Sequence, residues 1–187
     1  MGATIAKQDF PVSKARRYLE PGPVVLVSSR YEGESNIMTL GWHTILEFSP
    51  SLVGCMISAG NHSHRMIRES GECVINVPTT DLTDQVVGIG NVSGARVDKF
   101  AEFELTEEKA RHVAAPLIGE CHASFECRLY EDALVEANNF FIFEIVAAHV
   151  APKPEYPTTL HYTGGGIFMV AGEMIDRSKL FSKDMLE

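Results

Sequence analysis

The chain has 187 residues, of which 45% are hydrophobic and 22% charged, a composition typical of one globular domain with a sizeable core. We therefore predict a single domain over residues 1–187. The 25 acidic residues outnumber the 16 Lys and Arg and give a formal net charge of −9, which argues against nucleic acid and anionic membrane surfaces as partners.

Targeting signals and disulfides are not expected. No early apolar run has the length and flanks of a signal peptide, and none approaches the ~20 residues that span a bilayer, so we predict a cytoplasmic protein. The four cysteines form no Cys-x-x-Cys pair, and three of them, Cys55, Cys73 and Cys127, lie in apolar runs where thiols act as small hydrophobic groups. A thiolate zinc site is not predicted either.

The first third of the chain predicts strands. A short basic helix capped by Ser13 is expected first, and the Pro- and Gly-containing residues 20–23 end it. The apolar run 24–29 predicts a buried strand that leads through a polar turn into a second run, 38–46. This second run alternates apolar and polar residues, which predicts one half-exposed strand, and residues 52–57 predict a third.

Residues 58–78 combine a polar turn, a helix from Asn61, a Gly71 stop and a buried strand over residues 73–77. The free amides at the start of such a helix, with donors on His62, Ser63 and His64 beside them, suit a small phosphate dianion. The alternative is a capped connecting helix that binds nothing.

The second half continues the β pattern. We expect a short helix over 82–87 capped by Thr80 or Asp81, a glycine-containing loop over 88–99, and two long strands that include residues 125–129 and 140–150. A proline-rich connector, a glycine turn at 164–166 and a last strand at 167–170 follow. Many strands, short turns and brief helices favour an antiparallel barrel over a doubly wound parallel sheet.

Several familiar catalytic motifs are excluded. The glycines from Gly88 to Gly94 have a spacing that differs from the dinucleotide motif, and no clear strand precedes them. His62 and His64 point to different faces of a helix, so no metal site is predicted. The sequence has no Gly-x-Ser-x-Gly elbow, and the apolar surroundings of Cys55 and Cys73 would raise their pKa values.

Three motifs in a fixed order carry a family resemblance. They are Asn36-x-Met38-Thr39-x-x-Trp42, then His62-Ser63 followed by residues 67–78, and then Asp98-Lys99-Phe100. This series, within residues 23–170, resembles the flavin reductase-like family that includes the flavoredoxins. The resemblance implies a mainly β fold with short helices: an FMN-binding split β-barrel of Greek-key-like antiparallel strands. It also implies a homodimer that holds FMN at the subunit interface.

The resemblance assigns cofactor contacts to strand ends and turns. Those implied to line the edge of the isoalloxazine are Asn36, Met38, Thr39 and Trp42. Those implied to surround the phosphate are Ser58, Asn61, His62 and Ser63. Lys99 is implied to offer a cation to the flavin or its phosphate, with Phe100 near the ring and Phe168 packed on the cofactor.

The chain departs from the family at one point. Where the family often carries Asp-His, this chain has Ala137-Asn138, and the Asn138 amide donates hydrogen bonds but carries no charge. His161 is a candidate substitute for the missing imidazole, the alternative being a surface histidine in a loop. Cys55 is a second candidate, because it matches a strand cysteine near the flavin in flavoredoxin-like members.

Three functions stay open on the sequence. The first is an FMN-dependent oxidoreductase that passes electrons from NAD(P)H through the flavin to an acceptor, either a flavin or a redox protein. The second is a flavoredoxin-type electron carrier without an efficient NAD(P)H reaction. The third is a barrel that binds a different ligand, such as pyridoxal phosphate or haem. A cofactor-based reaction fits the lack of a catalytic triad or acid pair.

Overall fold

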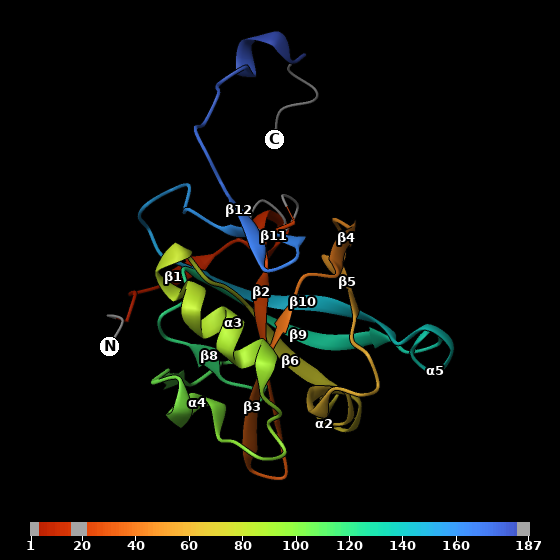
Figure 1. Ribbon diagram of the computed structural model, residues 1–187. Coiled ribbons are helices and arrows are strands. Elements are labelled where there is room, and N and C mark those ends of the chain that lie inside the picture. Colours follow the sequence, from red (N-terminus) through yellow and green to blue (C-terminus); the bar gives the residue numbers. More distant parts are fainter. Residues whose placement is uncertain (1–3, 16–21, 183–187) are drawn as a thin grey trace.

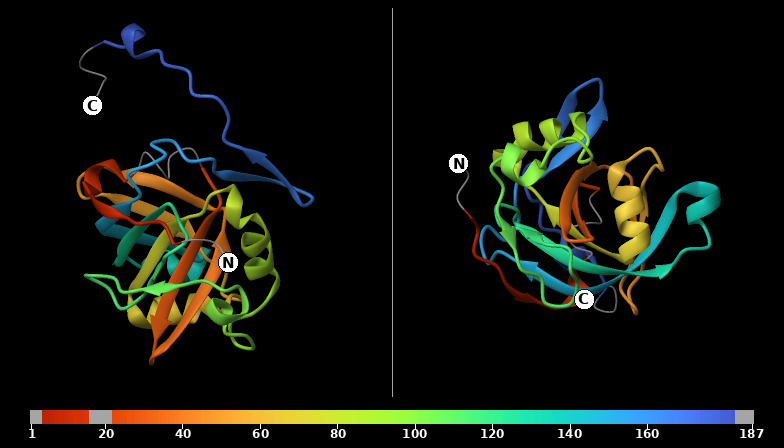
Figure 2. Two further views of the ribbon diagram at one scale, coloured as in Figure 1. Left: turned by 90° about the vertical axis from the view of Figure 1, so that its left-hand side faces the viewer. Right: turned by 90° about the horizontal axis from the view of Figure 1, so that it is seen from below.

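The main element of the structure is an antiparallel sheet of eight strands, shown in Figure 1 by a computed structural model that describes residues 4–15 and 22–182. The strands follow the order β3 (Glu34–Leu40), β2 (Val25–Tyr31), β6 (Glu72–Val77), β9 (Ala123–Glu131), β10 (Phe140–Val150), β5 (Leu52–Met56) and β4 (His43–Glu47), and β1 (Gln8–Phe10) pairs with β10. The sheet curls around its core (Figure 2). The prediction of a mainly antiparallel β fold is confirmed.

The β2–β3 hairpin shows how local sequence sets the register. Glu32 and Gly33 have φ angles of 51° and 86°, which are the left-handed values that a tight two-residue turn requires. The turn pairs Tyr31 with Glu34 and brings Leu26 opposite Thr39. Residues Asn36 and Met38 are thereby fixed on β3, where they line the site described below.

Alternation along β10 builds the main core. Phe141, Phe143 and Ile145 are buried while their neighbours are partly exposed, as expected for a strand with one face on the core. Phe141 stacks on Phe143 with a centroid separation of 5.8 Å and pairs across the sheet with Cys55. A second apolar cluster, which includes Leu26 and Ile37, joins the outer side of the β2–β3 hairpin to the helices.

Short helices cover this hairpin and one end of the sheet. They are α2 (His62–Ser70), the 3₁₀ turn η2 (Thr80–Leu82), α3 (Thr83–Asn91), α4 (Lys99–Glu102) and α5 (Val135–Asn138). The predicted α2 is confirmed, including its end at Gly71, where φ is 68°. Figure 1 shows α3 running across the face of the molecule next to β2 and β3.

The extent of α3 and its predicted cap were wrong. The helix runs to Asn91, so residues 88–91 are helical rather than looped. Gly88 is needed there because a Cβ at that position would lie 2.4 Å from the Phe103 ring. The helix is preceded directly by η2, which begins after Thr79, so neither Thr80 nor Asp81 is the cap of α3.

The alternating run 38–46 is two strands, not one. β3 ends at Leu40 and pairs with β2, whereas β4 begins at His43 and pairs with β5, which places the two at opposite ends of the strand order. Trp42 lies in the crossing between them and is 68% exposed. A continuous period-2 pattern cannot show which partner each part pairs with.

Smaller elements complete the chain. The last predicted strand is present as β12 (Ile167–Val170), but its partner β11 (Leu160–Gly164) was missed, as were β1 and the pair β7 (Glu107–Glu108) and β8 (Leu117–Ile118). At the N-terminus the structure has a 3₁₀ turn, η1 (Val12–Lys14), which follows Pro11 rather than a Ser13 cap. The rest of the predicted basic helix lies outside the described residues.

Candidate functional site

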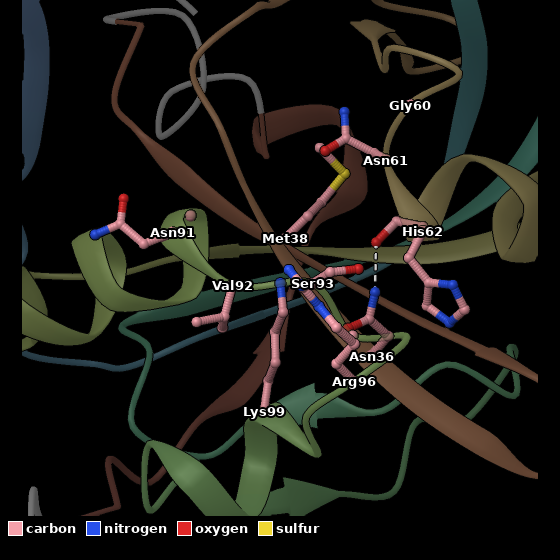
Figure 3. Close-up of a pocket in the computed structure, with 13 residues that line it drawn as sticks. Asn36, Met38, Gly60, Asn61, His62, Asn91, Val92, Ser93, Arg96 and Lys99 are labelled. Atoms are coloured by element: carbon pink, nitrogen blue, oxygen red, sulfur yellow. Dashed lines mark hydrogen bonds between the residues drawn. The ribbon is translucent and has the colours of Figure 1, made fainter.

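A pocket of about 220 Å³ opens where β3, the start of α2 and the segment after α3 meet (Figure 3). Thirteen residues line it: Asn36, Met38, Gly60, Asn61, His62, Ser63, Gly90, Asn91, Val92, Ser93, Gly94, Arg96 and Lys99. None of them is acidic, although the chain carries 25 Asp and Glu. The pocket is therefore locally positive in a negative protein.

The N-terminus of α2 forms one wall. Asn61 precedes the helix in an extended conformation and its side chain makes no capping hydrogen bond. The Ser58 carbonyl instead accepts hydrogen bonds from the main-chain and side-chain nitrogens of Asn61, at 2.9 and 3.3 Å. The His64 amide donates to the Asn61 carbonyl at 3.0 Å, so the amides of His62 and Ser63 remain available to an anion in the pocket.

Asn36 forms the floor and is only 3% exposed. Its Nδ2 donates to Ser63 Oγ at 2.8 Å, as the dashed line in Figure 3 shows. Its Oδ1 is buried and finds no hydrogen-bond partner among the described residues. A buried amide oxygen without a donor is costly, so this atom is a place where a ligand N–H or O–H would bind.

Gly94 is pressed against the Asn36 amide. A Cβ at Gly94 would lie 2.0 Å from Asn36 Oδ1 and 2.5 Å from its Cγ, a contact that no side chain tolerates. The glycine therefore lets the loop after α3 close over β3. This close approach brings the loop residues, including Arg96, to the pocket.

Lys99 joins two walls of the site. Its buried Nζ donates to the carbonyls of Ile37, at 2.8 Å, and Ile89, at 2.9 Å, which links β3 to the C-terminal part of α3. An ammonium group has three donors, so one remains for a ligand. Burial lowers the pKa of Lys99 to about 8, so the group is still mostly charged at neutral pH.

The neighbours of Lys99 explain its position. Asp98 is the N-cap of α4, and its carboxylate accepts hydrogen bonds from the amides of Phe100 and Ala101 at 3.1 and 3.2 Å. The Phe100 side chain is buried in the second apolar cluster and does not line the pocket. The Asp-Lys-Phe motif thus anchors the segment that carries the cation.

Half of the residues expected to bind the cofactor line this pocket, namely Asn36, Met38, Asn61, His62, Ser63 and Lys99. The other six lie elsewhere: Thr39, Trp42, Ser58, Phe100, Asn138 and Phe168. Thr39 does not line the pocket but links two elements that do, because its Oγ1 on β3 donates to the Val86 carbonyl of α3 at 2.7 Å. Ser58 is exposed in the turn before α2, and its Oγ accepts from the Gly60 amide at 3.4 Å.

The remaining candidates are dispersed. Asn138 is exposed at the end of α5, and Phe168 packs against Tyr162 in the β11–β12 hairpin with a centroid separation of 5.1 Å. His161 lies on β11 and bonds Thr159 Oγ1 through Nε2 at 2.9 Å. Cys55 is fully buried in the core, and burial raises the pKa of its thiol well above the ordinary value.

The sequence interpretation missed the segment from Gly90 to Gly94 and Arg96. The glycine spacing there did not match a dinucleotide motif, and that exclusion stands because the segment begins inside helix α3 and no strand leads into it. One sequence feature could have indicated that this segment lines the pocket. It is a run of small and polar residues that ends in the cation Arg96, just before Asp98-Lys99-Phe100.

Comparison with known proteins decides the family. The profile described as "Flavin reductase like domain" matches residues 16–170. The chain belongs to the flavin reductase-like family. An uncharacterized protein of Archaeoglobus fulgidus is 36% identical over 129 residues, which cover 69% of this chain and 72% of that protein.

Solved structures agree with this family. The FMN-binding domain of a flavin reductase-like enzyme from Shewanella baltica superimposes with a TM-score of 0.86 and 26% identity, over 93% of this chain and 98% of that one. A flavoredoxin from Methanosarcina acetivorans gives a TM-score of 0.74 and 25% identity, over 88% and 92% of the two chains. The fold of this family member is therefore the split β-barrel that the motifs implied.

Within residues 4–15 and 22–182 no helix is long and apolar enough to cross a membrane. The same part of the chain holds no cluster of three or more His, Cys, Asp or Glu residues that could bind a metal ion.

Proposed function

We propose that this flavin reductase-like protein binds FMN, with the phosphate in the pocket at the N-terminus of α2, and oxidises NAD(P)H. The observation that carries the proposal is the acid-free pocket itself. Helix amides, Arg96 and Lys99 line it together with Asn36, whose Oδ1 is unpaired. The amides and cations suit a phosphate dianion. The amide oxygen suits a hydroxyl of the ribityl chain or an N–H of the ring.

The size of the pocket bears on how FMN is held. Cofactor sites usually enclose roughly 300–1,000 Å³, whereas this pocket has about 220 Å³. One chain thus offers room for the phosphate end of FMN, and the ring would extend beyond the pocket. A second copy that covers the ring would complete the site, which supports a homodimer as part of the proposal.

The roles of the protein groups follow from their chemistry. FMN, when bound, supplies the redox chemistry, namely the capacity to accept hydride and to pass electrons to an acceptor. Ser63 and Asn36 would orient the ligand, because each is buried and each is fixed by the hydrogen bond between them. Lys99 would hold positive charge next to the cofactor while keeping β3 and α3 together.

The second candidate function is a flavoredoxin-type electron carrier. It is favoured by the position of Asn138, which is exposed at the end of α5, and by His161, which bonds Thr159 and does not line the pocket. No imidazole from these two positions is then available to place a nicotinamide. The likeness to the M. acetivorans flavoredoxin supports the same alternative.

Spectroscopy separates these functions. The purified protein, loaded with FMN and freed from excess, should show flavin bands, and it should bind FMN more tightly than riboflavin because only FMN carries the phosphate. Anaerobic addition of NADH or NADPH should then bleach the bands at a catalytic rate. Bleaching only by a chemical reductant would favour the carrier, and a protein that binds neither flavin would contradict both functions and leave pyridoxal phosphate or haem as ligands to test.

A further inference from the structure

The last residues that the structure describes form an arm that leaves the body of the molecule. Figures 1 and 2 show residues 171–182, here called the C-terminal arm, projecting beyond the β11–β12 hairpin. The Ala171 amide still donates to the Thr159 carbonyl at 2.9 Å. From Gly172 to residue 182, the hydrogen bonds of the described chain stay within the arm, as in the bond from the Ser178 amide to Asp176 Oδ1.

The arm carries apolar side chains that the body does not cover. Met174, Ile175, Leu180 and Phe181 are exposed by 60, 67, 80 and 56%. Single exposed apolar residues are ordinary, but four on one short segment, which ends in the 3₁₀ turn η3 (Ser178–Leu180), indicate a surface that another surface covers. The two acidic and two basic residues of the arm balance, so it is neutral in a chain of net charge −9.

A groove of about 440 Å³ lies at the root of the arm. Outside the arm it is lined by Phe10, Lys14, Glu155, Tyr156, Pro157 and Thr159. Tyr156 is 59% exposed, and the neighbouring hairpin adds Ile167 and Met169 at 64 and 61%. The root of the arm, residues 171–174, forms the other wall of the groove. The body side of the groove therefore offers apolar surface with one charge of each sign, Lys14 and Glu155, which matches the neutral balance of the arm.

We propose that the C-terminal arm is exchanged between two copies of this chain, each arm lying in the groove of the other copy. The groove and the arm lie at the same end of the molecule, so two copies related by a twofold axis satisfy both at once. Residues 171–177 alone reach at most roughly 23–25 Å when extended, and the 3₁₀ turn η3 (Ser178–Leu180) follows them at the end of the arm.

The size and charge of the contact favour a second copy as the occupant. The arm, the groove and the exposed side of the hairpin supply about twenty residues per copy, which is the lower end of the usual 20–30 for a stable interface. A neutral arm also avoids the mutual repulsion of two chains of charge −9. This proposal does not depend on the cofactor.

Sedimentation equilibrium tests the exchange. The full chain should be dimeric at micromolar concentration, and the double variant Leu180→Ser/Phe181→Ser should dimerise at least about a hundredfold more weakly, since both side chains lose apolar burial in each arm. The control is Val87→Ser/Leu134→Ser, which changes two apolar residues exposed by 42 and 43% elsewhere. A monomeric full chain, or an arm variant as tightly dimeric as the control, would overturn the proposal.

Crosslinking tests the location of the contact. The four native cysteines are buried, so Ser178→Cys introduces one accessible thiol for a benzophenone label. The benzophenone-bearing protein, prepared at natural isotope abundance, is mixed with ¹⁵N-labelled wild-type protein, and the mixture is irradiated. Crosslinks from residue 178 to the 153–159 segment of the ¹⁵N copy would support the exchange, whereas crosslinks confined to one copy, or to another surface, would refute it.

Discussion

Replacing Gly94 with alanine should damage the pocket without touching any charged group. The new Cβ would lie 2.0 Å from Asn36 Oδ1 and 2.9 Å from Nδ2, so either the loop or the Asn36 amide must move. Such overpacking costs about 1–3 kcal/mol, and loss of the Asn36–Ser63 hydrogen bond costs about 1 kcal/mol. We expect the free energy of unfolding to fall by about 2–4 kcal/mol and FMN affinity to fall at least about tenfold.

Urea unfolding and FMN titration measure the two effects. Gly90→Ala is the matched control for stability, because its Cβ would meet only Thr39, at an ordinary 3.6 Å, and alanine is the better helix former. That variant should unfold at the wild-type urea concentration or above it. If Gly94→Ala unfolds and binds FMN like the wild type, Asn36 is not fixed by the contact with Gly94, and the described geometry of the pocket floor is refuted.

Three further substitutions test the charges of the molecule. Arg96→Ala should weaken FMN binding about tenfold to a hundredfold in titrations while leaving riboflavin binding unchanged, since a hydrogen bond to a charged group contributes about 1.5–3 kcal/mol; equal losses for both flavins would count against a phosphate contact. FMN affinity of the wild type should fall as the pH rises above about 8, where Lys99 loses its proton, and Lys99→Met should lack that dependence. Glu126→Gln should lower the free energy of unfolding by about 3 kcal/mol at neutral pH, measured by urea denaturation, because the buried carboxylate accepts hydrogen bonds from the Arg111 amide at 2.9 Å and from His149 Nε2 at 2.7 Å. Burial alone would raise the pKa of Glu126, but these hydrogen bonds lower it, so this stability is present above the ordinary Glu pKa and is lost as the pH falls through the lowered value. The free energy of unfolding of the variant should therefore change less than that of the wild type as the pH is lowered. The same pH dependence in both proteins would contradict the stabilising role of the Glu126 carboxylate.

The part of the site that could be predicted from sequence is the part with local signals. The extended backbone at Asn61 and the left-handed glycine at Gly71 mark the two ends of α2 within a short stretch of chain. The turn before it then needs no distant contact to present its amides. The anion site predicted at residues 58–64 accordingly overlaps the pocket at Gly60, Asn61, His62 and Ser63.

The wall formed by the end of α3 and the loop that follows could not be predicted, because its position depends on contacts between residues far apart in the sequence. α3 continues through Gly88 despite the poor helix propensity of glycine, and the Phe103 ring occupies the space that a side chain at this position would need. The approach of Gly94 to Asn36 joins residues 58 positions apart, and it brings Arg96 to the site. The roles of Trp42, Asn138 and Phe168 in binding stay predictions, because the pocket in one copy does not include them.

The acid-free lining of the pocket reconciles an anionic ligand with a strongly negative chain. A net charge of −9 repels a phosphate at long range, but at physiological ionic strength that repulsion is screened beyond about 8 Å. Within that distance the ligand meets helix amides, Arg96 and the Lys99 ammonium, and no lining carboxylate opposes them. The excess negative charge therefore affects the rate of approach more than the strength of binding. Raising the salt concentration should accordingly leave FMN association nearly unchanged or faster, whereas a strong slowing would show that the local positive field extends well outside the pocket.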